Sequence, residues 1–273
     1  MDIVYSLIFG AIQGLTEFLP VSSSGHLVIL HSIFDFTLES ELGFDVFLHL
    51  GSLVALIVFF FKDIIRYIKA FFQSLVKWDL KNQVDQKLAW FIIIGTVPAA
   101  IAGFFLDSLI EEHLRSTLLV AIMLIVVAVL FFIVEKYSVK LKEMTSLKWY
   151  QSLLIGVAQA IALIPGTSRS GITIITGMTF GLKRGQAARF SFLLSIPIVF
   201  GAGLKKFIDL VLDGFINSEI LLYLLGFLAA AVVGYFCIKY FLKFLQKYSL
   251  AAFGWYRIGL AVLLFILIII FKI

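Results

Sequence analysis

Two polar stretches interrupt a chain that is otherwise almost entirely apolar: residues 13–26 read QGLTEFLPVSSSGH, and residues 159–171 read QAIALIPGTSRSG. Each stretch places hydroxyl side chains, two glycines and a proline between apolar flanks. Glu17 and His26 add ionisable groups to the first stretch, and Arg169 adds one to the second. Because ionisable groups in hydrocarbon are costly unless they face one another or a water-filled cavity, they mark a functional site. These stretches decide both the predicted fold and the predicted function.

The composition is typical of a polytopic membrane protein. Of the 273 residues, 62% are hydrophobic and 14% are charged, whereas a soluble domain is about half apolar and about one quarter charged. The net charge of +5 comes from cations scattered between apolar segments, a pattern that favours loops that set membrane orientation over a nucleic-acid-binding surface. We therefore expect a multi-pass protein in contact with membrane lipid, with no nucleic-acid partner, that forms a single membrane domain over residues 1–273.

Apolar runs of the roughly 20 residues that are needed to cross a bilayer occur at six places. The two polar stretches do not fit this pattern, because Pro20 or Pro165 and a hydroxyl-rich turn interrupt the apolar run before it resumes. A loop cannot face lipid at that depth, but a helix–loop–helix hairpin that is buried in protein can. We therefore predict an all-α integral membrane protein with two re-entrant helical hairpins, residues 3–34 and 149–182. The six predicted transmembrane helices are residues 44–61, 88–106, 117–134, 187–203, 221–240 and 255–271.

The two halves of the chain resemble each other. Small residues at 95, 99, 100 and 103 match small residues at 226, 230, 231 and 234, although such residues also recur wherever helices pack closely. Together with the match between the polar stretches, this predicts a first repeat at residues 1–137 and a second at 147–273, each a hairpin followed by three spans. The polar stretches match at an offset of 146 residues: Gly10, Gln13, Ser22, Ser24 and Gly25 fall on Gly156, Gln159, Ser168, Ser170 and Gly171.

The distribution of Lys and Arg predicts the orientation of the repeats. An odd number of crossings in each repeat requires the second copy to be inverted. Segments 62–87, 136–148, 183–189 and 239–247 contain sixteen Lys and Arg residues, whereas the loops on the other side contain four. If the basic segments are cytoplasmic, the hairpins enter the membrane from opposite sides and their turns meet near the midplane. Lys205 and Lys206 depart from this rule, because they lie in a loop on the other side. They weaken the assignment of one side to the cytoplasm but not the inversion of the second repeat.

The side chains of the two turns suit a phosphate or pyrophosphate ligand. Arg169 can donate two N–H groups to one phosphate, and the helices that resume after the turns direct their positive N-terminal ends towards the same region. For each serine and threonine the alternative stays open that it satisfies backbone groups freed in a broken helix. The residues concerned are Ser22, Ser23, Ser24, Thr167, Ser168, Arg169 and Ser170.

Glu17 and His26 are groups that a simple anion-binding site does not need. A carboxylate beside a phosphate repels it unless a divalent cation bridges them or the carboxylate orients a base. His26 follows Ser23 by three residues and can act as general base to a serine nucleophile or as acid to a leaving group. Asp45 and His49, four residues apart, can complete a metal site or support the site from outside, but a helix-start carboxylate and an interfacial histidine explain them equally well.

At these residues the sequence resembles the BacA-type undecaprenyl pyrophosphate phosphatase family. The two signature motifs are the pattern Gln-x-x-x-Glu from Gln13 to Glu17 followed by PVSSSGH at residues 20–26, and PGTSRSGIT at residues 165–173. The likeness extends over nearly the whole chain and includes FDVFLHLGS after the first hairpin and FSFLLSIP after the second. The first motif position of the family is glutamate or glutamine, so Gln13 is a permitted variant, and only Glu17 of the pair can ionise.

The resemblance implies an enzyme of the bacterial cytoplasmic (inner) membrane that hydrolyses undecaprenyl pyrophosphate to undecaprenyl phosphate and inorganic phosphate. That reaction recycles the lipid carrier of cell-wall synthesis and is linked to bacitracin resistance. The resemblance also implies a divalent cation, Mg²⁺ or Ca²⁺, with Glu17 as a candidate ligand. The implied catalytic residues are Glu17, Ser23, His26 and Arg169. The implied substrate-binding residues are Gln13, Ser22, Ser24, Thr167, Ser168, Ser170 and Thr173.

We expect Arg169 to hold the pyrophosphate while Ser23 attacks the terminal phosphorus with help from His26. Glu17 then binds the metal or orients His26, and direct attack by a water that His26 activates stays open as a second route. The alternative function is a transporter or flippase of polyprenyl phosphate, because secondary transporters also combine inverted repeats with broken helices. If the lipid carrier is released on the outer side of the membrane, the site is expected to open to the external, periplasmic side. Small-residue faces such as residues 95–103 can pack within the chain or between two chains, so a homodimer stays open.

Overall fold

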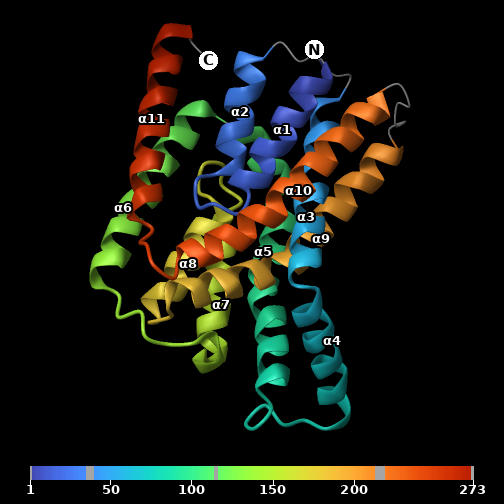
Figure 1. Ribbon diagram of the computed structural model, residues 1–273, viewed down its shortest axis with the longest axis vertical. Helices are drawn as coiled ribbons and strands as arrows, with labels where there is room; N and C mark the ends of the chain where they lie inside the picture. Colours follow the sequence, from blue (N-terminus) through green and yellow to red (C-terminus); the bar gives the residue numbers. More distant parts are fainter. Residues whose placement is uncertain (1, 35–39, 114–115, 213–218, 272–273) are drawn as a thin grey trace.

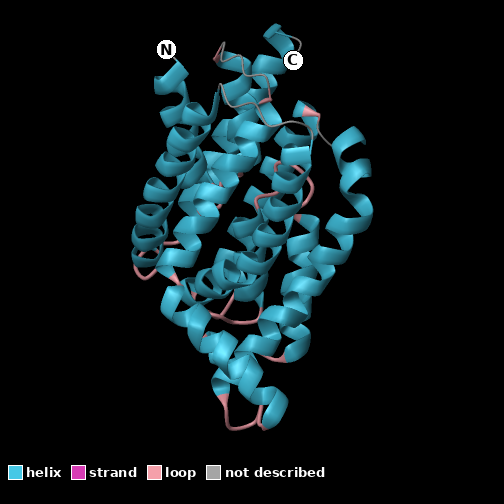
Figure 2. Ribbon diagram, turned by 90° about the vertical axis from the view of Figure 1, so that its right-hand side faces the viewer, coloured by secondary structure: helices cyan, strands magenta, loops and turns pink. Residues whose placement is uncertain are grey.

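The computed structural model describes residues 2–34, 40–113, 116–212 and 219–271. These residues are helical apart from short loops, which confirms the all-α membrane fold (Figures 1 and 2). The helices are α1 (Asp2–Thr16), α2 (Ser23–Ile33), α3 (Glu41–Phe59), α4 (Phe61–Val76), α5 (Val84–His113), α6 (Thr117–Tyr137), the 3₁₀ turn η1 (Met144–Ser146), α7 (Trp149–Ile161), α8 (Arg169–Thr179), α9 (Arg184–Leu212), α10 (Ile220–Phe244) and α11 (Ala251–Phe271).

Five helices of the described residues are long and apolar enough to cross a membrane, namely α5, α6, α9, α10 and α11. They contain the last five of the six predicted spans. The first predicted span, residues 44–61, differs, because α3 ends at Phe59 and α4 continues at an angle of 76°. α3 and α4 therefore form a sixth span only as a bent pair. The bend lies at Phe60, which caps both helices and whose backbone leaves the helical conformation with φ −97° and ψ 14°.

Two helix–turn–helix units lie where the hairpins are predicted. Residues 17–22 join α1 to α2, and residues 162–168 join α7 to α8. With 15, 11, 13 and 11 residues, these four helices are each too short to span a bilayer. Their turns meet in the centre of the molecule (Figure 1), where the Ser170 hydroxyl donates to the carbonyl of Leu19 over 3.2 Å. The structure therefore confirms two helical hairpins whose turns face each other.

Each hairpin packs its first helix on a helix from the other half of the chain. α1 lies on α10, and α7 lies on α5. A Cβ atom on Gly10 would lie 2.2 Å from the carbonyl oxygen of Gly226, and a Cβ atom on Gly156 would lie 2.2 Å from that of Gly95. Only glycine allows two helix backbones to approach this closely. The two glycine pairs occupy equivalent positions in the sequence repeat, and the internal duplication stays a prediction.

The first turn is anchored on the apolar core directly beside Glu17. Phe18 is fully buried, and its ring packs edge-to-face on that of Phe192 from α9, with 5.7 Å between the ring centroids. The largest buried apolar cluster continues from there around α8. The core thus supports both turns from one side and leaves their polar side chains to face each other.

The basic segments gather at one end of the molecule. The Lys87 ammonium donates to the carbonyl of Thr145 over 2.9 Å and joins the first two segments. Arg184, in the third, donates to both carboxylate oxygens of Glu135 over 2.8 and 2.6 Å, and the backbone N–H of Leu250, just beyond the fourth, donates to the same carboxylate over 2.7 Å. This end lies opposite the start of α1 and the end of α11 (Figure 1).

Candidate active site

Ser22 and Ser168 give the two turns the same local geometry. Each is the N-cap residue of the helix that follows, with a positive φ of 75° and 69°, respectively. Each hydroxyl accepts the backbone N–H three residues further on, that of Gly25 over 3.4 Å or that of Gly171 over 3.2 Å. Positive φ values are uncommon for residues other than glycine, and such strain is concentrated at functional sites. Both turns thereby direct the first residue of the next helix towards the same space.

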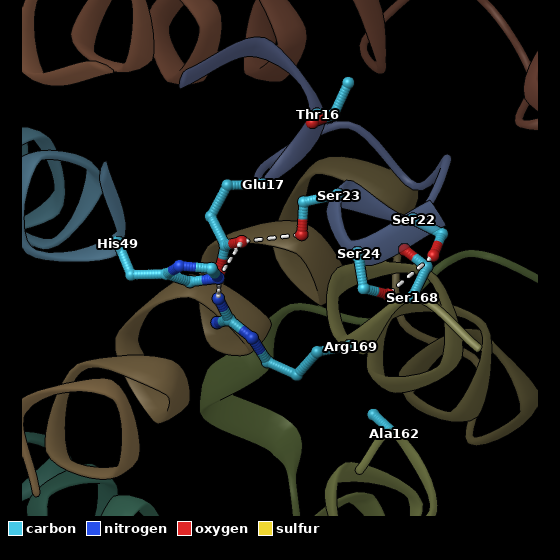
Figure 3. Close-up of a pocket in the computed structure, with 9 residues that line it drawn as sticks. All are labelled: Thr16, Glu17, Ser22, Ser23, Ser24, His49, Ala162, Ser168 and Arg169. Carbon is cyan, nitrogen blue, oxygen red and sulfur yellow. Dashed lines mark hydrogen bonds and ion pairs between the residues drawn. The ribbon is translucent and has the colours of Figure 1, made fainter. Parts of the chain in front are cut away.

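The two turns line a cavity of about 180 Å³ (Figure 3). This volume is below the roughly 300–1,000 Å³ of sites that enclose a whole small-molecule ligand, so the cavity suits a small polar group better than a lipid tail. Most of the lining side chains carry hydroxyl or charged groups. The lining residues are Thr16, Glu17, Ser22, Ser23, Ser24, His49, Ala162, Ser168 and Arg169.

The Glu17 carboxylate receives hydrogen bonds from both polar stretches (Figure 3). Arg169 Nη2 donates to Oε1 over 2.5 Å, Ser23 Oγ donates to Oε2 over 2.9 Å, and Gln13 Nε2 donates to Oε2 over 3.1 Å. The side chains of Glu17 and Arg169 are only 9% and 14% exposed. Because water screens such a pair little, their attraction is stronger than that of a surface ion pair. One carboxylate thus joins the two hairpins.

Five buried polar atoms of the two polar stretches have no hydrogen-bond partner among the described residues. They are Arg169 Nη1, Thr167 Oγ1, Gln13 Oε1 and both side-chain amide atoms of Gln159, Oε1 and Nε2. Since buried polar groups in proteins are nearly always hydrogen-bonded, unpaired ones indicate a place for a ligand or water. A guanidinium N–H and a hydroxyl can donate to phosphate oxygens, and an amide oxygen can bind a cation. The unpaired atoms therefore match the chemistry of a phosphate ligand.

Three of the six predicted substrate-binding hydroxyls line the cavity, and those of Thr167, Ser170 and Thr173 do not. The Ser170 hydroxyl donates to a backbone carbonyl of the first turn over 3.2 Å. The Thr173 hydroxyl pairs with a serine hydroxyl of α9 over 2.6 Å. Both therefore hold the second hairpin in place. The hydroxyls that line the cavity are those of Ser22, Ser24 and Ser168.

His26 is turned away from Ser23. Its Nδ1 lies 2.7 Å from the carbonyl oxygen of Ser22, and its Nε2 lies 2.7 Å from the hydroxyl of Tyr256 on α11, on which the ring also stacks. His26 also lies outside the set of residues that line the cavity. The expected contact between His26 and Ser23 is therefore not made, because α2 directs the serine towards Glu17 and the histidine towards α11. The catalytic role of His26 stays a prediction.

His49, which the sequence offered together with Asp45 as a possible metal ligand or supporting residue, lies at the cavity, whereas Asp45 is not among the lining residues. Its Nε2 is 3.9 Å from Glu17 Oε2, and its Nδ1 is 2.8 Å from the carbonyl oxygen of Asp45. The Asp45 carboxylate instead faces His31, 3.3 Å away. The sequence signal for His49 was its spacing of four residues from Asp45 in an apolar segment. A histidine at the membrane interface would give the same pattern, so this signal alone did not assign it to the site.

The residues at the cavity fit a divalent cation that binds together with a phosphate. Glu17 supplies the one carboxylate among the described lining residues, and Gln13, which does not line the cavity but donates Nε2 to Glu17, has an unpaired Oε1. In the part of the chain that the structure describes, no group of three or more His, Cys, Asp or Glu side chains is placed to hold a metal ion. Mg²⁺ is commonly bound by one or two carboxylates together with substrate phosphates, and this donor set agrees with that arrangement.

Comparison with known proteins gives a consistent result over the whole chain. The family described as bacitracin resistance protein BacA matches residues 6–263. The undecaprenyl-diphosphatase of Rubrobacter xylanophilus is 43% identical over 264 residues, which cover 96% of this chain and 97% of that protein. Proteins of the same name from Methanosphaera stadtmanae and Thermomicrobium roseum are 40% and 38% identical; these matches cover 94% and 98% of this chain and 94% and 99% of those proteins. The chain therefore belongs to the BacA family.

Proposed function

We propose that this chain hydrolyses undecaprenyl pyrophosphate to undecaprenyl phosphate and inorganic phosphate. The observation that carries the proposal is the contact of Ser23 and Arg169 with Glu17, which places a nucleophile, a carboxylate and a guanidinium with an unpaired nitrogen at one cavity. Membership of the BacA family and the undecaprenyl-diphosphatase name of the similar proteins support it. The product is a lipid carrier that cell-wall synthesis can use again.

Arg169 binds the pyrophosphate in this proposal. Without substrate, its Nη2 is bound to Glu17 and its Nη1 has no partner among the described residues. A phosphate that displaces the carboxylate receives two parallel N–H donors from the guanidinium. The hydroxyls of Ser22, Ser24 and Ser168 add neutral donors around it. These groups stabilise the negative charge of the phosphoryl group as it is transferred.

Ser23 supplies the attacking oxygen. Its hydroxyl already donates to Glu17 Oε2, so Glu17, in place of the expected His26, accepts the proton as Ser23 Oγ bonds to the terminal phosphorus. The bond from that phosphorus to the bridging oxygen breaks, undecaprenyl phosphate leaves, and water hydrolyses the phosphoserine to release inorganic phosphate. The second route, attack by a water that Glu17 deprotonates, uses the same contacts without a phosphoserine.

A divalent cation, Mg²⁺ or Ca²⁺, is part of the proposal. Glu17 and Gln13 Oε1 would hold it together with phosphate oxygens of the substrate, where it would neutralise part of the pyrophosphate charge. We expect a chelator to abolish phosphate release and added Mg²⁺ or Ca²⁺ to restore it. Full activity of the chelator-treated protein would contradict this part of the proposal.

We further propose that the protein lies in the bacterial cytoplasmic membrane, with its basic end in the cytoplasm and its cavity open to the external side. The clustering of Lys and Arg at one end supports this orientation. The partners are then the lipid substrate and the surrounding membrane lipid. A homodimer is also proposed. At one end of the small-residue face that suggested it, Gly95 packs on Gly156 within the chain, whereas at the other end a Cβ atom on Gly103 would meet nothing within 4 Å.

Phosphate release by the purified protein in detergent tests the proposal and separates it from the flippase alternative. Arg169→Ala is compared with Arg66→Ala, a change to an arginine at the basic end whose side chain is 48% exposed. We expect Arg169→Ala to lower kcat by about 10²–10³-fold, because a donor to the developing charge is lost, and Arg66→Ala to keep its activity. A wild-type protein that released no phosphate but moved undecaprenyl phosphate across liposome membranes would favour the flippase.

A further inference from the structure

Arg257 lies within the apolar helix α11, and its side chain has no exposed surface. An ionisable residue inside a membrane helix is costly and is a functional candidate by default. None of the contacts of the proposed reaction uses this residue. Its position inside the predicted span at residues 255–271 is the sequence signal that marks it.

The guanidinium of Arg257 donates to backbone carbonyls of three different segments. Nη1 donates to Pro20 in the first turn over 3.3 Å. Nη2 donates to Gly166 and Thr167 in the second turn over 2.8 and 3.1 Å. Two carbonyls of α6 accept from Nε and Nη2, each over 3.2 Å. Among the described residues, no carboxylate forms an ion pair with it, so carbonyl oxygens and the ring of Phe131, 5.6 Å from Cζ, surround the charge.

Two of these carbonyls are equivalent positions of the two turns. Pro20 and Gly166 are separated by 146 residues, the offset that relates the two polar stretches. Arg257 therefore binds the same backbone group of both turns at the point where the hairpins meet. Each of the two carbonyls lies three residues before a residue at the cavity, Ser23 in one turn and Arg169 in the other.

We propose that Arg257 is a positioning residue for phosphoryl transfer, a role that rests on the proposed phosphatase function. By binding both turns through one rigid fork, it sets the distance between the Ser23 hydroxyl and the Arg169 guanidinium. These two groups must be placed accurately on one pyrophosphate, and a misplacement of about 1 Å can lower a rate by about 10²-fold.

The hydrogen bonds of Arg257 to the two turns matter most when substrate is bound. Before binding, the ion pair between Glu17 and Arg169 also joins the two turns. In the proposed reaction a phosphate takes the place of the carboxylate at Arg169, so this connection is lost during turnover. The hydrogen bonds of Arg257 persist, because none of its five acceptor residues lines the cavity.

The shape of the guanidinium explains why arginine occupies this position. Arginine carries five N–H groups on three nitrogens in a planar fork, whereas a lysine carries its donors on one atom. A single ammonium group at residue 257 cannot reach carbonyls in both turns and in α6 at once. Arg257→Lys therefore keeps the charge and removes the bridge.

The first test compares Arg257→Lys with the wild type in the phosphate-release assay, with Arg66→Lys at the basic end as matched control. We expect kcat of Arg257→Lys to fall at least about tenfold, while KM for undecaprenyl pyrophosphate changes less than about threefold, because displaced turns impair the chemical step more than lipid binding. Arg66→Lys should match the wild type. An unchanged kcat in folded Arg257→Lys protein would overturn the positioning role.

The second test combines Arg257→Lys with Arg169→Lys. Effects of independent residues multiply, whereas effects that act through the same group do not. If Arg257 acts by placing the turn of Arg169, the double variant loses less activity than the product of the two single losses. A loss equal to that product would contradict the proposal. Should Arg257→Lys fail to fold, Arg257→Gln, a neutral side chain with a donor, undergoes the same two tests.

The two proposals fail in different ways. A wild-type protein that releases no phosphate contradicts the proposed function itself. An active wild type with an equally active Arg257→Lys variant contradicts only the positioning role of Arg257.

Discussion

Ser23 and Arg169 occupy the same position in two equivalent turns, and both bind the carboxylate of Glu17. Each is the first residue of the helix after its turn, and 146 residues separate them. The carboxylate itself has no ionisable counterpart, because Leu163 stands at the matching position. The backbone frame of the site is therefore repeated, whereas the side chains that would act on a phosphate differ: a hydroxyl and a carboxylate come from one copy and a guanidinium from the other.

Replacing the carboxylate should stop the reaction without unfolding the protein. Glu17→Gln keeps the size and one acceptor oxygen of the side chain but cannot take a proton from Ser23. We expect kcat to fall by about 10²–10⁴-fold, the usual contribution of a general base. The control is Glu143→Gln, whose side chain is 47% exposed at the basic end. Normal thermal melting of Glu17→Gln together with more than about a tenth of wild-type activity would exclude Glu17 as the base.

A phosphoserine intermediate distinguishes the two hydrolytic routes. With the terminal phosphate of the lipid radiolabelled, rapid quenching should trap label on the wild-type protein. Ser23→Ala should trap none and should lose turnover, whereas Ser146→Ala, at an exposed serine of η1, should behave like the wild type. Substantial turnover by Ser23→Ala would instead favour direct attack by water.

The contact between Tyr256 and His26 provides a test of whether His26 takes part. Tyr256→Phe removes the hydroxyl that lies 2.7 Å from His26 Nε2 and keeps the stacked ring. A lost hydrogen bond of about 1 kcal/mol corresponds to about a fivefold lower kcat if the histidine contributes. If His26 acts as acid to the leaving group, we expect this loss in the wild-type background and none in His26→Ala. An equal loss in both backgrounds would mean that the tyrosine acts independently of the histidine.

The close helix contacts predict which glycines are needed for stability. Gly156→Ala would place a Cβ atom 2.2 Å from the carbonyl oxygen of Gly95 and force α7 away from α5. We expect destabilisation by about 1–3 kcal/mol, as overpacking commonly causes, and a melting temperature lower by several degrees. Gly103→Ala on α5, where a Cβ atom meets nothing within 4 Å, is the control. Equal melting temperatures for the two variants would contradict the tight packing.

Most of the fold could be predicted because a bilayer imposes constraints that are visible in sequence. The length of apolar runs predicted five spans within α5, α6, α9, α10 and α11. The requirement that every backbone group be satisfied predicted the hairpins from their interrupted runs. The bend after Phe59 was not predicted, because an apolar run does not reveal where its helix changes direction.

The site could be predicted only as far as motif and spacing allow. The motifs identified Glu17, Ser23 and Arg169, which the structure brings together. Spacing cannot show which distant helix lies beside a given side chain. The contact of His26 with Tyr256, 230 residues away on α11, could therefore not be predicted. Arg257 was overlooked for a related reason: counting cations in loops passes over one that lies inside a span.

The packing of α1 on α10 also determines when this protein can complete its fold during synthesis. α1 is translated long before α10, but the backbone that packs on Gly10 belongs to α10, which begins only at Ile220. Until α10 is made, α1 lacks the helix on which it packs. The polar turn of the first hairpin then lacks the protein that shields it from lipid. α11, which follows α10, brings Arg257 to both turns. Ser23 therefore becomes part of a finished site only when α11 has been translated and inserted.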